Sequence, residues 1–218
     1  MNRMAEFEKH LPQTQRAIFR GLKSPLAVQA YLDSLPYKAE ELDRSPLRVM
    51  TDGQAHCLDG GIFAALALWR IGFRPLILDL VPEPGMDDDH VLALFQVNGG
   101  WGALAKSNYP NLRYREPVQR SLRELAMTYF EFFFSLKREK TLRGYTRPLD
   151  LSSFKDPSWM WEEDGIRKVS KRLYGLKPIP LITQASAAQL NLSDERTYTA
   201  GTVGTDFNWS YGMRPDSH

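Results

Sequence analysis

Apolar side chains recur at helical spacing in the first quarter of the chain. Residues 6–22 carry them every three or four positions, and Pro12 is expected to interrupt or restart that helix. The Ser24-Pro25 pair predicts the start of a further helix, because serine caps a helix N-terminus and proline suits its first position. Residues 38–50 are charged and irregular, so no element is predicted there.

A second region combines a helix with strands. Residues 58–71 are apolar on nearly every side, which is typical of a buried central helix, and Gly72 ends it. Strands are predicted at residues 75–81, 90–97 and 101–105, the last two joined by a hairpin turn at residues 98–100. A helix on an antiparallel sheet is therefore expected at the centre of the protein.

The remaining chain predicts less regular structure. Residues 117–138 show a strong apolar face at helical spacing and predict a long helix. Short helices are expected at residues 161–173 and 185–190, and residues 193–218 lack periodicity, which favours an extended or partly disordered tail. These patterns indicate an α+β fold, divided into an N-terminal helical segment (1–50), a core (51–145) and a C-terminal extension packed on the same domain (146–218).

The composition excludes several classes of protein. The 218 residues are 43% hydrophobic and 25% charged, as in ordinary globular proteins, with 28 basic and 26 acidic residues mixed along the chain. Without a basic block, no nucleic-acid partner is expected. No run approaches the roughly 20 apolar residues of a membrane span, and the first residues lack the apolar stretch of a secretory signal, which predicts a cytoplasmic protein without a membrane partner.

The single cysteine, Cys57, stands where the polar residues 51–56 give way to the apolar helix. One cysteine excludes an internal disulfide framework and a Cys-rich zinc site. The first turn of a helix favours a thiolate, so the thiol pKa is expected below the roughly 8.5 of free cysteine, and Cys57 is a candidate nucleophile. The alternative is a small buried hydrophobe. His90, which begins a predicted strand, is the candidate base, or else a structural histidine.

The order of these features resembles the transglutaminase-like cysteine superfamily, which has a papain-related core. The similarity runs from a helix-opening cysteine through Gly72-Phe-Arg-Pro75 to the strand that begins with His90 and the hairpin that ends in Gly100-Trp101, over residues 51–108. It implies that Cys57 attacks an amide carbonyl after His90 takes its proton. A thioester then forms, which water or an amine resolves, and no cofactor or metal is needed.

The third member of the implied catalytic triad differs from the family pattern. An aspartate is expected about four residues after the hairpin tryptophan, but Ala105 stands there. Asn108 is favoured as its replacement because an amide oxygen accepts from an imidazole N–H, and Ser107, which has the right strand parity, is the second choice. Asp89 is a further alternative.

Other residues near the predicted site have possible roles. The backbone N–H of Cys57 is expected to stabilise an oxyanion, helped by a side-chain donor from Gln54 or His56, and His56 is also a rival base. Lys106 and Trp101 lie beside the predicted triad and are expected to contact substrate. Asp87, Asp88, Asp89 and His90 are a weak candidate for a metal site, because three consecutive acidic residues do not easily converge.

Three functions remain open. The first is a cysteine-dependent hydrolase or acyl transferase that acts on a peptide, protein or small-molecule amide. The second, suggested by Ala105, is a catalytically degenerate binding module of the same fold. The third is an amide-forming enzyme of a small-molecule pathway. The sequence predicts no oligomeric state.

Overall fold

A computed structural model describes residues 3–213 of the protein, and its centre is one antiparallel sheet. The strands are β1 (Leu76–Pro82), β2 (His90–Val97), β3 (Gly100–Leu104), β4 (Arg115–Gln119), β5 (Leu142–Tyr145), β6 (Leu149–Asp150) and β7 (Ile179–Pro180). They lie in the order β4-β3-β2-β1-β5-β7, and β6 pairs with β1. The predicted strands β1, β2 and β3 and their hairpin are confirmed to within two residues.

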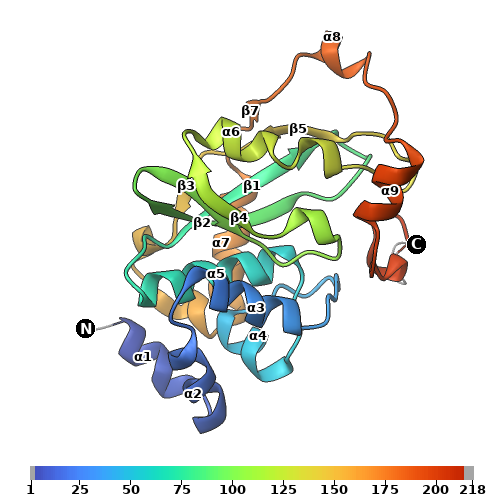
Figure 1. The fold of residues 1–218 in the computed structure, drawn as a ribbon. Coiled ribbons are helices and arrows are strands. Elements are labelled where there is room, and N and C mark those ends of the chain that lie inside the picture. The colour runs from blue at the N-terminus through green and yellow to red at the C-terminus, as the bar shows by residue number, and fades with distance from the viewer. Residues whose placement is uncertain (1–2, 214–218) are drawn as a thin grey trace.

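Helices lie on both faces of this sheet. They are α1 (Arg3–His10), α2 (Gln13–Gly21), α3 (Pro25–Ser34), α4 (Pro46–Asp52), α5 (Cys57–Arg70), α6 (Leu122–Met127), α7 (Glu163–Tyr174), α8 (Gln184–Ala187) and α9 (Glu195–Gly201). Short 3-10 helices occur at Pro110–Leu112, Phe130–Phe132, Leu151–Ser153, Pro157–Met160 and Phe207–Trp209. Figure 1 shows α1 to α5 and α7 on one side of the sheet and α6 on the other. The predicted α+β class, with a buried helix on an antiparallel sheet, is confirmed.

The N-terminal helices follow from local signals. Pro12 separates α1 from α2, as predicted, and the Ser24 hydroxyl caps α3 by accepting a hydrogen bond from the Ala27 N–H. The prediction of irregular structure over residues 38–50 is wrong at its end, because α4 begins at Pro46. The same serine-proline signal starts it, and the Ser45 hydroxyl accepts from the Arg48 N–H.

Helix α5 packs unusually close to the sheet. A Cβ added to Gly60 would lie 2.3 Å from the Lys106 Cβ, and one added to Gly61 would lie 2.8 Å from Val91 Cγ1. The two glycines therefore allow the first turns of α5 to touch β2 and the residues that follow β3. This contact fixes where the helix N-terminus lies relative to the start of β2.

The long helix predicted over residues 117–138 is wrong. Strand β4 occupies the first part, Ser121 caps the six-residue α6, and the chain then tightens into the 3-10 helix Phe130–Phe132. Tyr129, Phe130 and Phe133 are buried in the core under α6. The spacing of apolar residues matched a helix because these buried positions recur every three or four residues.

The C-terminal third adds to the same sheet through β5, β6 and β7, none of which was predicted. Helices α7 and α8 lie close to the predicted short helices. An extended or partly disordered tail was expected after residue 193, and this prediction is wrong for residues 195–201. They form α9, which the Asp194 carboxylate caps. The end of that predicted tail, residues 214–218, lies outside the described residues. Among helices of residues 3–213, none has the length and apolar character needed to cross a membrane.

Two hydrophobic cores flank the sheet. One contains α5 and the N-terminal helices and includes Val91, Ala93 and Phe95 of β2. The other lies under α6 and includes Leu92 and Leu94. Alternate residues of β2 therefore point into different cores, as the two-residue period of a strand requires.

Candidate functional site

Cys57 is the first residue of α5, and its thiol lies at the edge of a cavity of about 190 Å³. The thiol donates a weak hydrogen bond to the main-chain carbonyl of Asp89, with 3.7 Å between sulfur and oxygen. The cavity is lined by Tyr37, Ala39, Glu40, Glu41, Asp43, His56, Cys57, Asp88, Asp89 and Tyr174. We call this space the acidic cavity, since five of its lining residues are carboxylic acids.

The surroundings of Cys57 raise the pKa of its thiol well above the ordinary value. Burial is the largest cause, and the negative charge of Asp89 is the next. The lower pKa expected from the helix N-terminus is therefore not found, because desolvation and acidic neighbours outweigh the helix dipole. This environment favours the neutral thiol over the thiolate.

His90 points away from Cys57. Its neighbour Val91 faces α5, where it contacts Gly61, so the His90 side chain leaves β2 on the opposite face. The imidazole Nε2 lies 2.7 Å from the Leu112 carbonyl oxygen, to which it donates. No hydrogen bond joins Cys57 to His90 among residues 3–213. The structure thus does not bring together the pair expected from the sequence.

The core around His90 keeps its ring neutral. The rings of Tyr129 and Phe133 lie edge-on, with centroids 6.4 Å from that of the imidazole. Burial lowers the pKa of His90 to about 4, despite the hydrogen bond to Leu112, which acts in the opposite direction. His90 therefore behaves as a buried structural histidine in this conformation, the alternative that the sequence left open.

Asn108 and Ser107 do lie near His90, in a second cavity of about 30 Å³. Neither side chain is hydrogen-bonded to the imidazole in the described part of the chain. Asn108 instead binds the backbone of Asp206 with both ends of its amide, at 2.8 and 3.0 Å, and the Ser107 hydroxyl accepts from the Tyr109 N–H. In this structure the imidazole binds the Leu112 carbonyl and neither of these two side chains.

His56 caps α5. Its Nδ1 accepts from the Leu58 N–H at 3.3 Å, and its Nε2 lies 3.2 Å from Asp59 Oδ1. Asp59 is completely buried and also accepts from the Arg44 N–H, and burial raises its pKa to about 7. These bonds hold His56 as a helix cap beside the cavity.

Two of the expected oxyanion donors, Gln54 and the Cys57 backbone N–H, have different surroundings. Gln54 donates to the Glu40 carboxylate at 3.4 Å, so its amide is directed to that side chain. The backbone N–H of Cys57, by contrast, takes part in no hydrogen bond among the described residues. Of the two, only the Cys57 N–H remains available to a ligand.

Lys106 and Trp101 do not line either cavity. The Lys106 ammonium is buried and donates to the carbonyls of Leu32 and Leu35, where it closes the C-terminus of α3. Burial lowers its pKa to about 8. Trp101 is half-buried on β3 and packs against the core that contains α6. In this structure both side chains are engaged within the fold.

Asp79 was missed by the sequence analysis. It lies on β1, where it is paired with Val91, and it is 4% exposed. Its carboxyl hydrogen-bonds to that of Asp89, which requires the pair to hold a proton. Burial is the leading cause that raises the pKa of both acids, and the charge of Asp89 raises the pKa of Asp79 further. A lone aspartate inside an otherwise apolar strand was the available signal.

No metal site is evident among residues 3–213, where no three His, Cys, Asp or Glu side chains are placed to share an ion. Asp87 illustrates why the consecutive acids do not converge. Its carboxylate accepts from the Thr141 hydroxyl at 2.8 Å, whereas Asp89 is turned toward Asp79.

The chain matches no protein-family model and no curated protein. Solved structures of LapG from Legionella pneumophila are similar at a distance. One has 16% sequence identity and a TM-score of 0.35, over 46% of this chain and 70% of that one. The EGTA-treated and calcium-bound forms each have 12% identity and a TM-score of 0.38, over 72% of this chain and 86% and 87% of theirs. This likeness is a distant one of fold.

Proposed function

We propose that the protein binds a cationic group, an amine or a guanidinium, in the acidic cavity. The observation that carries this proposal is the charge of the lining, which includes Glu40, Glu41, Asp43, Asp88 and Asp89 and no lysine or arginine. Arg44 does not line the cavity, but it pairs with the lining residue Glu40 and with Asp52 and Asp59. The charge of Arg167 acts on Asp43. The His56 imidazole also lines the cavity, with Nε2 3.8 Å from Asp43, so acidic groups outnumber basic ones in the lining.

The protonation of these acids supports the proposal. The pKa values of Asp43, Asp79 and Asp89 are all raised, with burial as the leading cause. A carboxyl with a raised pKa gains more from a nearby cation than one that is already paired. A bound ammonium would replace the proton that Asp79 and Asp89 share, so binding is coupled to proton release.

In this proposal the fold acts as a binding module, the second of the functions considered from the sequence. The support for this reading is that the Cys57 thiol binds the Asp89 carbonyl and the His90 ring binds the Leu112 carbonyl. Cys57 then supplies a small, polarisable wall of the cavity. The volume of about 190 Å³ accommodates one alkylammonium or guanidinium head with a short stem.

Calorimetry with n-butylammonium tests this proposal, with n-pentanol as an uncharged ligand of similar length. We expect saturable binding of the amine, tighter as the pH rises from 5 to 8 because the carboxyls lose their protons. Buffers of different ionisation enthalpy should reveal proton release. Asp89→Asn and Glu41→Gln should each weaken binding by about tenfold, the usual effect of losing a charged hydrogen-bond partner.

Glu195→Gln is the matched control, because this exposed carboxylate lies on α9 and outside the cavity. Equal binding of pentanol and butylammonium would contradict the proposal. So would equal effects of Glu41→Gln and Glu195→Gln, since both replace exposed acids and neither disturbs the buried pair.

A second candidate is acyl transfer through a Cys57 thioester, as a cysteine-dependent amide hydrolase, an acyl transferase or an amide-forming enzyme. One observation favours it. The free backbone N–H of Cys57 stands at a helix N-terminus beside the thiol, the position in which a donor stabilises an oxyanion. This function requires the His90 ring to leave the Leu112 carbonyl and reach the α5 face.

Mass spectrometry after treatment with p-nitrophenyl acetate tests the second candidate. Acylation of Cys57 at pH 7 that is lost in His90→Gln would support acyl transfer and contradict the simple binding module. Absence of a Cys57 adduct, with normal alkylation of the unfolded chain, would contradict acyl transfer.

A further inference from the structure

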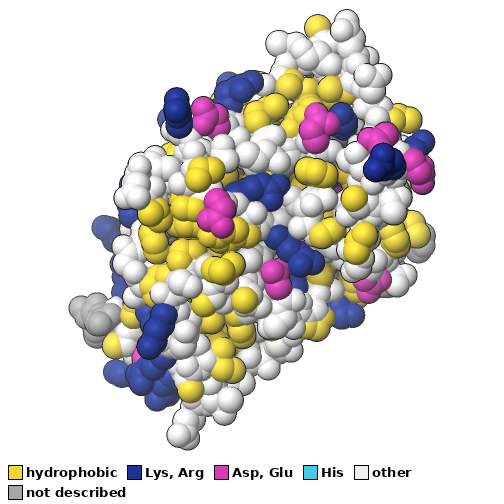
Figure 2. Space-filling model, in the orientation of Figure 1, with side chains coloured by type: hydrophobic (Ala, Val, Ile, Leu, Met, Phe, Trp, Pro, Cys, Tyr) yellow, Lys and Arg dark blue, Asp and Glu magenta, His cyan; other side chains and the backbone are white. Residues whose placement is uncertain are grey.

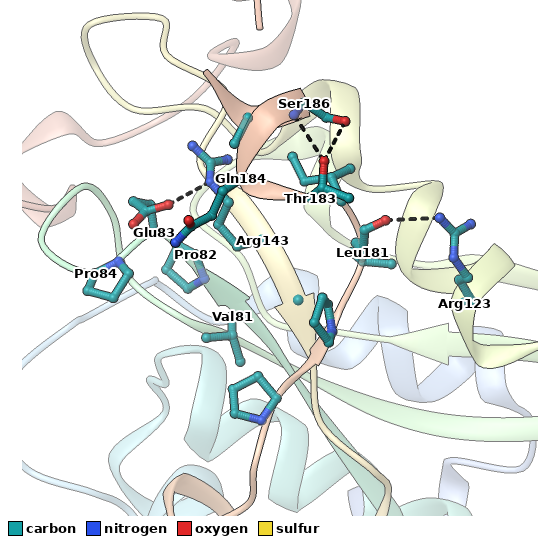
Figure 3. A pocket seen from close by; sticks show the side chains of 15 residues that line it. Val81, Pro82, Glu83, Pro84, Arg123, Arg143, Leu181, Thr183, Gln184 and Ser186 are labelled. Atoms are coloured by element: carbon teal, nitrogen blue, oxygen red, sulfur yellow. Dashed lines mark hydrogen bonds and ion pairs between the residues drawn. The ribbon is translucent and has the colours of Figure 1, made fainter. Parts of the chain in front are cut away.

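A cleft of about 890 Å³ lies between the end of β1, strand β5 and the arm that carries α8. Val81 and Pro82 contribute from β1, Arg143 from β5, and residues 178–187 form the opposite wall. Figure 3 shows these side chains around the space, with Arg123 of α6 beside the Leu181 carbonyl. None of the lining residues belongs to the acidic cavity.

The walls of the cleft are mostly apolar. They include Val81, Pro82, Pro84, Pro178, Pro180, Leu181, Ile182 and Ala187. Hydrophobic side chains gather where the arm of α8 meets the body of the protein, as Figure 2 shows. The prolines limit backbone movement, and the volume lies within the roughly 300–1,000 Å³ of sites that hold small molecules. The cleft thus offers a preformed apolar surface.

Two arginines supply positive charge at the cleft. Arg143 is held by Glu83, with Nε 2.7 Å from the carboxylate, and its Nη1 donates to the carbonyls of Lys140 and Leu142. Arg123 donates from Nη2 to the Leu181 carbonyl at 2.9 Å. The other nitrogens, Nη2 of Arg143 and Nε and Nη1 of Arg123, make no hydrogen bond among the described residues.

We propose that this cleft binds a small amphipathic anion, a molecule with an apolar body and one carboxylate. The lining holds two guanidinium groups and one carboxylate, Glu83, so its own charge is positive. The free N–H groups suit a carboxylate head, and the proline-rich walls suit an aliphatic or aromatic body.

The backbone of the cleft disfavours an extended peptide as the occupant. Pro178 and Pro180 have no N–H, the Leu181 N–H donates to the Arg143 carbonyl, and the Leu181 carbonyl accepts from Arg123. Strand addition needs free backbone donors and acceptors at a sheet edge, and β7 offers few. The side-chain chemistry therefore selects a small molecule.

Displacement of 8-anilinonaphthalene-1-sulfonate by decanoate tests the proposal on the full chain. We expect one saturable decanoate site, and 1-decanol to bind about tenfold more weakly because it lacks the charge. Arg143→Gln and Arg123→Gln should each weaken decanoate by about tenfold and leave decanol unchanged. Ala187→Trp, which fills the cleft, should abolish both.

Arg196→Gln is the control, because Arg196 is exposed on α9 outside the cleft. Failure of decanoate to bind saturably would overturn the proposal, as would Arg123→Gln and Arg143→Gln variants that both behave like Arg196→Gln. Arg143→Gln also removes the partner of Glu83, which could weaken binding by itself. Arg123→Gln leaves the bond between Glu83 and Arg143 intact, so it tests the charge separately.

Discussion

The side chains of Cys57 and His90 lie on opposite faces of the central sheet. The thiol reaches the main-chain carbonyl of Asp89 on the α5 face, and the imidazole of the next residue binds the Leu112 carbonyl on the other. Asp89 and His90 are neighbours at the start of β2, but only Asp89 meets Cys57. The order of residues in the sequence alone would have paired the cysteine with the histidine. In this arrangement Cys57 lines the acidic cavity and His90 lines the second, smaller one.

His90 should make folding stability depend on pH. Its folded pKa of about 4 lies below the ordinary 6.5, so the unfolded chain binds more protons between these values and stability falls as the pH drops through this window. Relative to His90→Gln, wild type should lose on the order of 3 kcal/mol of unfolding free energy between pH 7 and pH 4. Urea unfolding of both proteins measures this.

The comparison with His90→Gln removes the contribution of the buried carboxylic acids, which titrate in both proteins. A constant difference in unfolding free energy across this pH range would contradict a neutral, buried His90.

Lys106 is expected to stabilise the fold without contacting ligand. Lys106→Met removes the donor of the Leu32 and Leu35 carbonyls and should cost about 1–3 kcal/mol of unfolding free energy, with unchanged binding of n-butylammonium. Lys177→Met, at an exposed position, should change stability by less than about 0.5 kcal/mol. Weaker amine binding in a fully stable Lys106→Met protein would restore the substrate contact expected from the sequence.

Gly60 should be required for the approach of α5 to the residues after β3. In Gly60→Ala the new Cβ would lie 2.3 Å from the Lys106 Cβ, an atom close to the backbone that cannot move alone. We expect a loss of about 2 kcal/mol, because overpacking outweighs the better helix propensity of alanine. Gly21→Ala meets open space and should leave stability unchanged or raised. Chemical denaturation of the two variants gives a direct comparison.

Asn108 should hold the C-terminal segment. Asn108→Ala removes both amide bonds to the Asp206 backbone, so limited proteolysis should cut near residues 205–213 faster than in wild type. Asn191→Ala, at an exposed site, serves as the control. The alkylation rate of Cys57 should not change in Asn108→Ala; a change would indicate that Asn108 acts on the cysteine through His90.

The sequence correctly predicted the helices and strands whose ends are set by a few neighbouring residues. The Ser24-Pro25 cap, the apolar helix that begins beside Cys57 and the Asn98-Gly-Gly hairpin are all present near their expected positions. Each is specified by a few neighbouring residues, through capping or turn geometry. The irregular segment after β4 was misread because apolar spacing reports burial and does not distinguish one helix from several short turns.

The sequence does not predict which side chains meet Cys57, and the reason is physical. Both faces of β2 are apolar, with Val91 and Ala93 on one and Leu92 and Leu94 on the other, so the pattern does not say which face meets α5. The close approach at Gly61 decides this, and it places Asp89, not His90, on the cysteine side. The hydrogen-bond partner of His90 is the main-chain carbonyl of Leu112. Every residue has such a carbonyl, so the sequence does not indicate which one the imidazole binds.

The pH dependence of Cys57 alkylation by iodoacetamide tests most directly whether the thiol has a raised pKa and acts independently of His90. Because burial and Asp89 raise the pKa of this thiol, the folded protein should react with an apparent pKa above the roughly 8.5 of free cysteine. The urea-unfolded chain supplies that reference, and His90→Gln should give the same profile as wild type. A thiol that titrates below pH 7 in wild type and loses this reactivity in His90→Gln would contradict the account.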